Sequence, residues 1–123
     1  MYEILIVGGG PAGLTAAIYA ARAGKHVAVL ERGTTGGQII SAPLVENYPG
    51  IPSVSGTELA RQMTEQACTF GAEIVYTEAV GLEKTPAGFR VLCTDGVREA
   101  KTVILATGAA HRSLGLAAGE ALT

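Results

Sequence analysis

The chain has 123 residues, with 9 basic against 11 acidic side chains and a formal net charge of −2 at pH 7. This length predicts a single domain, and the apolar share of 48% is enough for a sizeable core. The near balance of charge gives no electrostatic case for a nucleic-acid partner. Cys68 and Cys93 form neither a C-x-x-C pair nor a metal-ligand spacing, so we expect reduced, half-buried thiols without a redox role.

Residues 4–21 carry no charged side chain, but they do not have the character of a membrane span. Three consecutive glycines and Pro11 interrupt the apolar run and favour a turn at that point. No basic segment precedes the run, and no small-residue cleavage site ends it, so a signal peptide is not expected either. The sequence therefore predicts a cytoplasmic protein that does not associate with a membrane.

The first part of the chain has the order strand, glycine turn, helix and strand. The segments are residues 4–7, the G-x-G-x-x-G of Gly8, Gly10 and Gly13, residues 11–23, and residues 25–30. This order is typical of a βαβ unit that binds a dinucleotide.

Each glycine of the turn has a mechanical role in such a unit. Gly8 permits the tight turn, Gly10 lets the backbone approach a pyrophosphate, and Gly13 lets the helix pack closely on the sheet. Pro11 suits the first helical position and Gly24 suits a left-handed C-terminal cap. The helix N-terminus carries about half a positive charge beside free N–H groups, which favours a diphosphate.

Glu31 follows the second strand, 18 residues after Gly13, where a carboxylate is expected to accept ribose hydroxyls. A 2′-phosphate beside this carboxylate would suffer like-charge repulsion, so FAD or NAD is favoured over NADP. Arg32 is a further candidate near the cofactor, where its charge would soften that preference, although a solvated surface charge is the simpler interpretation.

The segment 32–56 is rich in glycine and proline and is too long for an idle connector. Gly36, Gly37 and Gln38 place flexible backbone beside a side-chain amide, which suits hydrogen bonds to a planar polar ring. Asn47 offers a second amide on a stiffened turn. Solvated or turn-forming amides remain an equal alternative for Gln38 and Asn47.

The rest of the chain predicts one helix and several short strands. Ser55 and Glu58 resemble a capping box for a helix over 56–70, in which Met63 and Phe70 face the core. The expected strands are residues 72–76, an antiparallel meander of 80–83, 89–94 and 97–101, and a final strand over 103–106. The predicted fold is therefore α/β and Rossmann-like, with a parallel sheet, crossover helices and a small antiparallel β-meander.

Five motifs, spread over nearly the whole chain, resemble a known family. They are GGGPAGLTAAIYAARA at 8–23, GGQ at 36–38, VENYPG at 45–50, SGTEL at 55–59 and ATG at 106–108. The chain resembles the N-terminal FAD domain of low-molecular-weight thioredoxin reductases, within the flavoprotein pyridine nucleotide-disulfide oxidoreductases. The GGQ and VENYPG motifs are the most particular to this family.

The resemblance implies FAD in an extended pose. The implied contacts are Gly10, Pro11 and Ala12 at the pyrophosphate, Glu31 at the adenosine ribose, Gly36, Gly37, Gln38 and Asn47 along the ribityl chain and flavin, the backbone near Ala79 at the adenine, and Thr107 and Gly108 closing over the cofactor. Gly8, Gly13 and Arg32 complete the set of candidate cofactor-binding residues from the turn and the end of the second strand. No catalytic residue and no metal ligand is expected among these 123 residues.

The family pattern also implies what should lie beyond Thr123. Residues 1–115 would form the FAD-binding domain and residues 116–123 the start of a linker to a pyridine-nucleotide domain, with GLAAGE at 115–120 in place of the usual G-x-P-G-E. The parent would be a homodimeric reductase that passes electrons from NADPH through FAD to thioredoxin or a similar disulfide protein. The alternatives are the FAD domain of a thioredoxin-reductase-like ferredoxin or flavodoxin NADP reductase, and a non-catalytic nucleotide-binding module.

Overall fold

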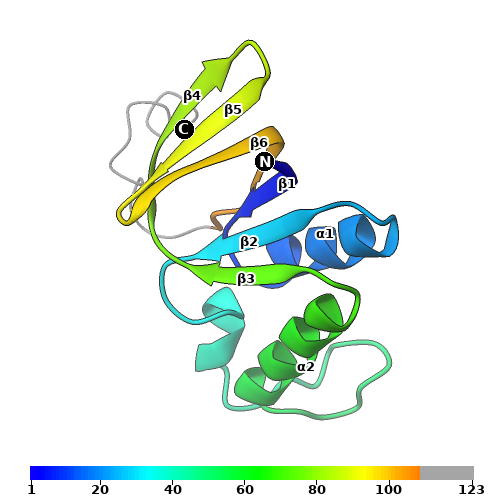
Figure 1. Cartoon of the computed structure of the whole chain (residues 1–123). Coiled ribbons are helices and arrows are strands. Elements are labelled where there is room, and N and C mark those ends of the chain that lie inside the picture. Colours follow the sequence, from blue (N-terminus) through cyan, green and yellow to red (C-terminus); the bar gives the residue numbers. More distant parts are fainter. Residues whose placement is uncertain (109–123) are drawn as a thin grey trace.

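The structure is a computed structural model, and it describes residues 1–108. In this part of the chain, all strands join one six-stranded sheet in the order β3-β2-β1-β6-β5-β4 (Figure 1). The elements are β1 (Tyr2–Val7), α1 (Pro11–Arg22), β2 (Val27–Glu31), the 3₁₀ helix η1 (Gly37–Ser41), α2 (Gly56–Thr69), β3 (Glu73–Tyr76), β4 (Ala79–Thr85), β5 (Gly88–Cys93) and β6 (Gly96–Leu105). The expected α/β, Rossmann-like class is confirmed.

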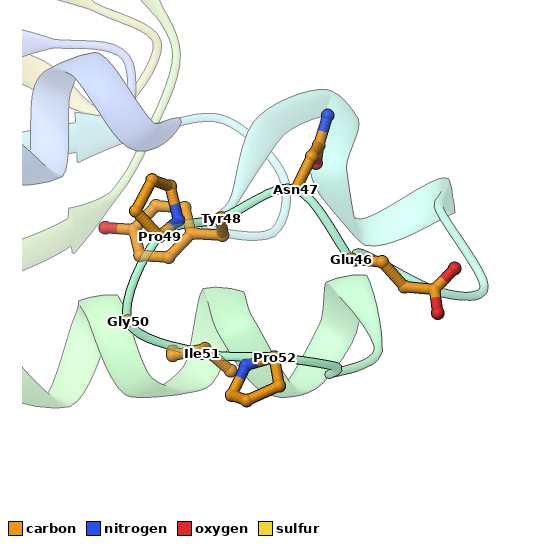
Figure 2. A pocket seen from close by; sticks show the side chains of 7 residues that line it. All are labelled: Glu46, Asn47, Tyr48, Pro49, Gly50, Ile51 and Pro52. Atoms are coloured by element: carbon orange, nitrogen blue, oxygen red, sulfur yellow. The ribbon is translucent and has the colours of Figure 1, made fainter.

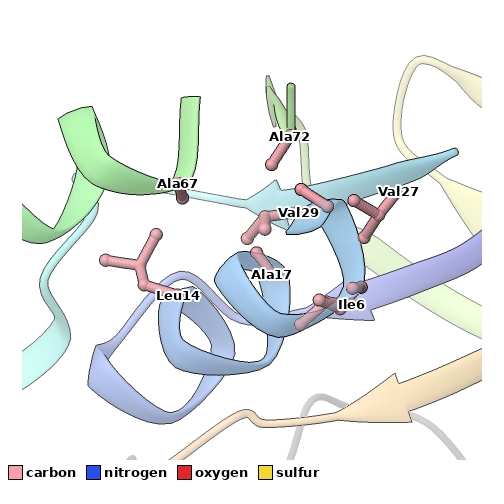
Figure 3. Packing of buried hydrophobic residues seen from close by; sticks show 9 residues of the cluster. Ile6, Leu14, Ala17, Val27, Val29, Ala67 and Ala72 are labelled. Atoms are coloured by element: carbon pink, nitrogen blue, oxygen red, sulfur yellow. The ribbon is translucent and has the colours of Figure 1, made fainter. Parts of the chain in front are cut away.

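The parallel part of the sheet is built by two crossovers. Helix α1 connects β1 to β2 and helix α2 connects β2 to β3, and all three strands run parallel. Both helices pack on the same face of the sheet, where Leu14 and Ala17 of α1 meet Val29 of β2 and Ala67 of α2 (Figure 3). Met63 of α2 lies partly buried against this cluster, as expected.

Helix α1 begins and ends as its sequence predicts. Pro11 occupies the first turn, and Gly24 adopts a φ of +79° just beyond the helix. The N–H of Gly24 donates to the carbonyl of Ala21 at 2.9 Å, and the N–H of Lys25 donates to the carbonyl of Ala20 at 3.1 Å. This pair of bonds is a Schellman motif, which satisfies the last carbonyls of the helix.

Helix α2 confirms half of the expected capping box. The hydroxyl of Ser55 accepts a hydrogen bond from the N–H of Glu58 at 3.1 Å, but the carboxylate of Glu58 pairs with Arg61 instead of returning to Ser55. The prediction that Phe70 is a core residue is wrong, because the helix ends before it and its side chain is 42% exposed. The guanidinium of Arg22 covers the ring at 5.6 Å from its centroid.

The strands expected at 97–101 and 103–106 are one continuous strand, β6. Its first half pairs antiparallel with β5 and its second half pairs parallel with β1, and Ala100 has partners on both sides, Phe89 and Tyr2. No glycine or proline interrupts the run, so the backbone stays extended while its neighbours change. This strand therefore joins the meander and the parallel strands into one sheet.

The meander also buries the second face of the parallel strands. Val91 of β5 and Ala79 of β4 cluster with Leu5, Val7 and Leu30. The described part of the chain thus has a hydrophobic core on each side of β1 and β2. This explains why the sequences of these two strands are apolar throughout instead of alternating with polar residues.

Both cysteines are free thiols, and the half-buried state expected of them holds only for Cys93, since Cys68 is exposed on α2. None of the helices within residues 1–108 combines the length and apolar character needed to cross a bilayer.

Candidate functional site

The turn between β1 and α1 depends on two glycines. Gly8 has a φ of +113°, and a Cβ there would lie 2.1 Å from the carbonyl oxygen of Ala106. A Cβ on Gly13 would lie 1.9 Å from the carbonyl oxygen of Gly8. Gly8 therefore makes the tight turn, and Gly13 lets α1 pack directly against it.

The carboxylate of Glu31 is fixed at the end of β2 by two main-chain donors. The N–H of Gly9 donates to Oε1 at 2.9 Å, and the N–H of Gly33 donates to Oε2 at 2.8 Å. A carboxylate has about four acceptor positions, so about two remain for a ligand's hydroxyl groups. Sequence reasoning did not single out Gly9 or Gly33, and the only signal for Gly9 is that it is the middle glycine of G-G-G.

The N-terminus of α1 faces the same turn without a side-chain cap. Gly10 is the N-cap residue, with extended backbone, no acidic residue lies in the first turn, and Pro11 has no N–H. The first-turn N–H groups, including that of Ala12, are therefore available to an anion, and the helix dipole favours a negative charge there.

The glycine pair of the following loop lies against this N-terminus. The N–H of Gly36 donates to the carbonyl of Gly9 at 2.7 Å, and a Cβ on Gly37 would lie 3.2 Å from the Cα of Gly10. The loop is anchored on α2, because the hydroxyl of Thr64, which lies 2.8 Å from the carbonyl of Ala60, shares a hydrogen bond of 2.9 Å with the hydroxyl of the buried residue Thr35. The backbones of Gly10 and Gly37 thus lie close together, with no side chain between them.

The end of β6 completes this edge of the sheet. The N–H of Ala106 donates to the carbonyl of Val7 at 2.8 Å, which brings Thr107 beside Gly8. Thr107 and Gly108 are both exposed. The carboxyl ends of β1, β2 and β6 therefore meet at one edge, which is where open α/β sheets bind ligands.

Other predicted residues lie around this edge rather than in it. Arg32 is exposed, and its guanidinium lies 3.7 Å from the carboxylate of Glu78, so it has a protein partner at the surface. Ala79 is buried at the start of β4, two residues after Thr77, whose N–H donates to the carbonyl of Glu31 at 3.0 Å. The backbone at Ala79 is thus tied to the end of β2 through Thr77.

The two predicted amides are solvent-accessible. Gln38 is exposed in η1, and Asn47 is exposed on a short hairpin closed by the Val45–Val54 and Tyr48–Ile51 bridges. Residues 46–52 line an open hollow of about 470 Å³ on this hairpin (Figure 2). The hollow involves none of the glycine-turn residues, so it is separate from the edge formed around Glu31.

Within residues 1–108, no group of three or more histidine, cysteine, aspartate or glutamate side chains is placed to hold a metal ion. The groups gathered at the edge around Glu31 are main-chain N–H donors, one carboxylate and a helix N-terminus. This combination is complementary to a diphosphate joined to a ribose.

Comparison with known proteins identifies the family. The model of the family described as pyridine nucleotide-disulphide oxidoreductase matches residues 2–122. The thioredoxin reductase of Listeria monocytogenes is 40% identical over 123 residues, covering 100% of this chain and 39% of that protein. The thioredoxin reductase of Treponema pallidum is 44% identical over 116 residues, covering 94% of this chain and 38% of that protein.

A crystal structure shows the same relationship. The thioredoxin reductase from Streptococcus pyogenes superposes with a TM-score of 0.87 at 48% identity, covering 94% of this chain and 38% of that one. The chain thus spans well under half the length of the relatives it matches. On the match over residues 2–122, the chain belongs to the pyridine nucleotide-disulphide oxidoreductase family.

Proposed function

We propose that this chain is the FAD-binding domain of a thioredoxin reductase, a protein that passes electrons from NADPH through FAD to the disulfide of thioredoxin. The observation that carries the proposal is the Glu31 carboxylate, held by the N–H groups of Gly9 and Gly33 beside the uncapped N-terminus of α1. The names of the relatives support thioredoxin as the acceptor. We assign NADPH binding and disulfide reduction to a longer, homodimeric protein.

The residues around the turn fit the diphosphate half of FAD. Gly10, Pro11 and Ala12 would hold the pyrophosphate, because Gly10 has no Cβ to keep a ligand from its backbone and the uncapped helix N-terminus favours the ligand's charge. Glu31 would accept the ribose hydroxyls with its remaining acceptor positions. The backbone near Ala79 would lie beside the adenine, with Arg32 at the rim.

The remaining residues would lie along the ribityl chain and the flavin ring. Two observations support this: the loop with Gly36, Gly37 and Gln38 contacts Gly9 and Gly10, and the end of β6 brings Thr107 beside Gly8. Gly108 follows Thr107 directly. Asn47 would join them from the hairpin. When bound, FAD supplies the capacity to accept a hydride and to pass on electrons, and this chain supplies binding and orientation.

A titration with FAD and FMN tests the assignment. The purified chain is expected to bind FAD and to bind FMN much more weakly, because FMN lacks the adenosine half that Glu31 and α1 would hold. Gly10→Ala is the informative variant. Its methyl would lie no closer than 3.7 Å to any protein atom apart from its chain neighbours, so the fold can accept it. The methyl would nevertheless stand on the backbone that we propose approaches the pyrophosphate.

The variant Gly24→Ala is the matched control, because Gly24 lies at the opposite end of α1. We expect Gly10→Ala to keep its stability and lose FAD, and Gly24→Ala to lose stability and keep FAD. A wild-type chain that folds but binds FAD no better than FMN would overturn the proposal, as would full FAD affinity in Gly10→Ala.

A further inference from the structure

We propose that Thr77 is a positioning residue for Glu31, and that Asp95 and Arg98 hold Thr77 in place. This inference rests on the proposed function, because it assigns Thr77 to the recognition of the ribose hydroxyls. Thr77 lies in the connection between β3 and β4, Asp95 in the turn between β5 and β6, and Arg98 in β6 itself.

Thr77 makes hydrogen bonds to two separate segments of the chain. Its main-chain N–H donates to the carbonyl of Glu31 at 3.0 Å, and its hydroxyl donates to Oδ1 of Asp95 at 2.6 Å. Thr77 itself is only 8% exposed, whereas the side chain of Asp95 is 52% exposed, so the network lies at the boundary between the core and the surface. Thr77 therefore connects the end of β2 to the turn between β5 and β6.

The acceptor for the Thr77 hydroxyl is itself fixed. Arg98 donates to both oxygens of Asp95, from Nη1 to Oδ1 at 2.6 Å and from Nη2 to Oδ2 at 3.2 Å. The hydrogen bonds from Arg98 and then from Thr77 lower the pKa of Asp95 to about 2, so Asp95 is ionised at neutral pH. A second hydrogen bond joins the same two segments: the N–H of Thr94 donates to the carbonyl of Glu78 at 2.9 Å.

This network matters because Glu31 is the last residue of β2. The pairing of β2 with β3 ends at Glu31 and Tyr76, and the bond from Thr77 is the next main-chain contact beyond it. The side chain of Glu31 must at the same time reach Gly9 and Gly33. A shift of Thr77 would move the backbone of Glu31 and so weaken the hold of both glycines on its carboxylate.

If Thr77 only stabilises the fold, its replacement should affect the binding of different nucleotides equally. If it positions Glu31, only nucleotides with ribose hydroxyls should be affected. Thr77→Val keeps the β-branched shape and removes only the hydroxyl. The probes are ADP and 2′,3′-dideoxy-ADP, which differ only in the ribose hydroxyls, measured by calorimetry. If Thr77 positions Glu31, the preference of the chain for ADP falls about threefold, a part of what one hydrogen bond to a charged group contributes, and binding of the dideoxy nucleotide is unchanged.

Two further variants sharpen the comparison. Asp95→Asn removes the charge that holds Thr77 and is expected to lower the preference for ADP in the same direction. Thr102→Val is the matched control, because its hydroxyl also donates a hydrogen bond, to the carbonyl of Glu3 at 2.8 Å, but lies outside the network. The control is expected to leave the preference unchanged.

Amide hydrogen exchange by NMR provides a readout without any ligand. In Thr77→Val, the N–H groups of Gly9 and Gly33 are expected to exchange faster, because the Glu31 carboxylate that protects them is less well held. Unchanged exchange, or an equal loss of affinity for both nucleotides, would overturn the positioning role. Failure of the wild-type chain to bind ADP would instead overturn the proposed function, while the exchange data would still show whether Thr77 holds Glu31.

Discussion

Replacing Gly13 with alanine tests the close packing of α1 against the glycine turn. Alanine is the better helix former by about 1 kcal/mol, so helix propensity alone predicts that Gly13→Ala stabilises the chain. The structure predicts the opposite result, because Gly13 is buried and its new Cβ would lie 1.9 Å from the carbonyl oxygen of Gly8 and 3.3 Å from Cγ2 of Ile6.

The size of the effect follows from that distance. An ordinary carbon–oxygen contact is about 3.3 Å, so the helix and the turn must separate by roughly 1.4 Å to admit the methyl. Such a movement would open gaps around Leu14 and Ala17, which are fully buried. We assign about 3–4 kcal/mol to this overpacking, and after the gain in helix propensity the net loss in free energy of unfolding is about 2–3 kcal/mol.

Urea unfolding followed by circular dichroism measures this loss, with Gly24→Ala as the control. A Cβ on Gly24 would meet no other atom within 4 Å, so only its φ of +79° opposes alanine, at a cost of about 1–2 kcal/mol. The packing of α1 would be refuted if Gly13→Ala were as stable as the wild-type chain, or if it cost less than Gly24→Ala.

Three more predictions concern single side chains. Glu31→Gln replaces one carboxylate oxygen by an NH₂ group that faces a main-chain N–H donor. The binding free energy for FAD should therefore weaken by about 1–3 kcal/mol. Equal affinity of the variant and the wild-type chain in calorimetry would contradict the ribose contact. The pKa of Asp95 is lowered from 3.8 to about 2 in the folded chain, so its contribution to stability is present above pH 3.8 and is lost as the pH falls towards 2. Acid unfolding of Asp95→Asn should lack this component, and identical profiles for the two chains would count against it. Ser55→Ala should lower the free energy of unfolding by about 1 kcal/mol through loss of the α2 cap, whereas Ser53→Ala should not; equal thermal unfolding of both variants would refute the cap.

The first crossover could be predicted from the sequence because its signals are local. Gly8, Gly13 and Gly24 mark a tight turn, a close approach and a helix end, and the structure has each feature where the spacing predicts it. The continuity of β6 could not be predicted in the same way, because it depends on two different neighbours, β5 and β1. The prediction that Phe70 is buried was wrong for a related reason. Helical spacing shows which residues share one face of a helix, but it does not show that the helix ends at Thr69.

The candidate site likewise contains residues that a local pattern predicts and residues that it does not. Glu31 is identified by its distance from the glycines along the chain, a local pattern. Its main-chain donors, Gly9 and Gly33, and its support through Thr77 depend on tertiary contacts that no local pattern encodes. Gln38 and Asn47, which are exposed, stay predictions together with the other cofactor contacts.

The most direct measurement is the visible absorption spectrum of the chain after mixing with excess FAD and removing the unbound flavin by gel filtration. If the edge formed by Gly10, Glu31 and Gly37 binds the cofactor, flavin absorbance elutes with the folded protein at one FAD per chain, and Gly10→Ala elutes colourless. A wild-type chain that is folded by circular dichroism and elutes without flavin would contradict FAD binding by these residues.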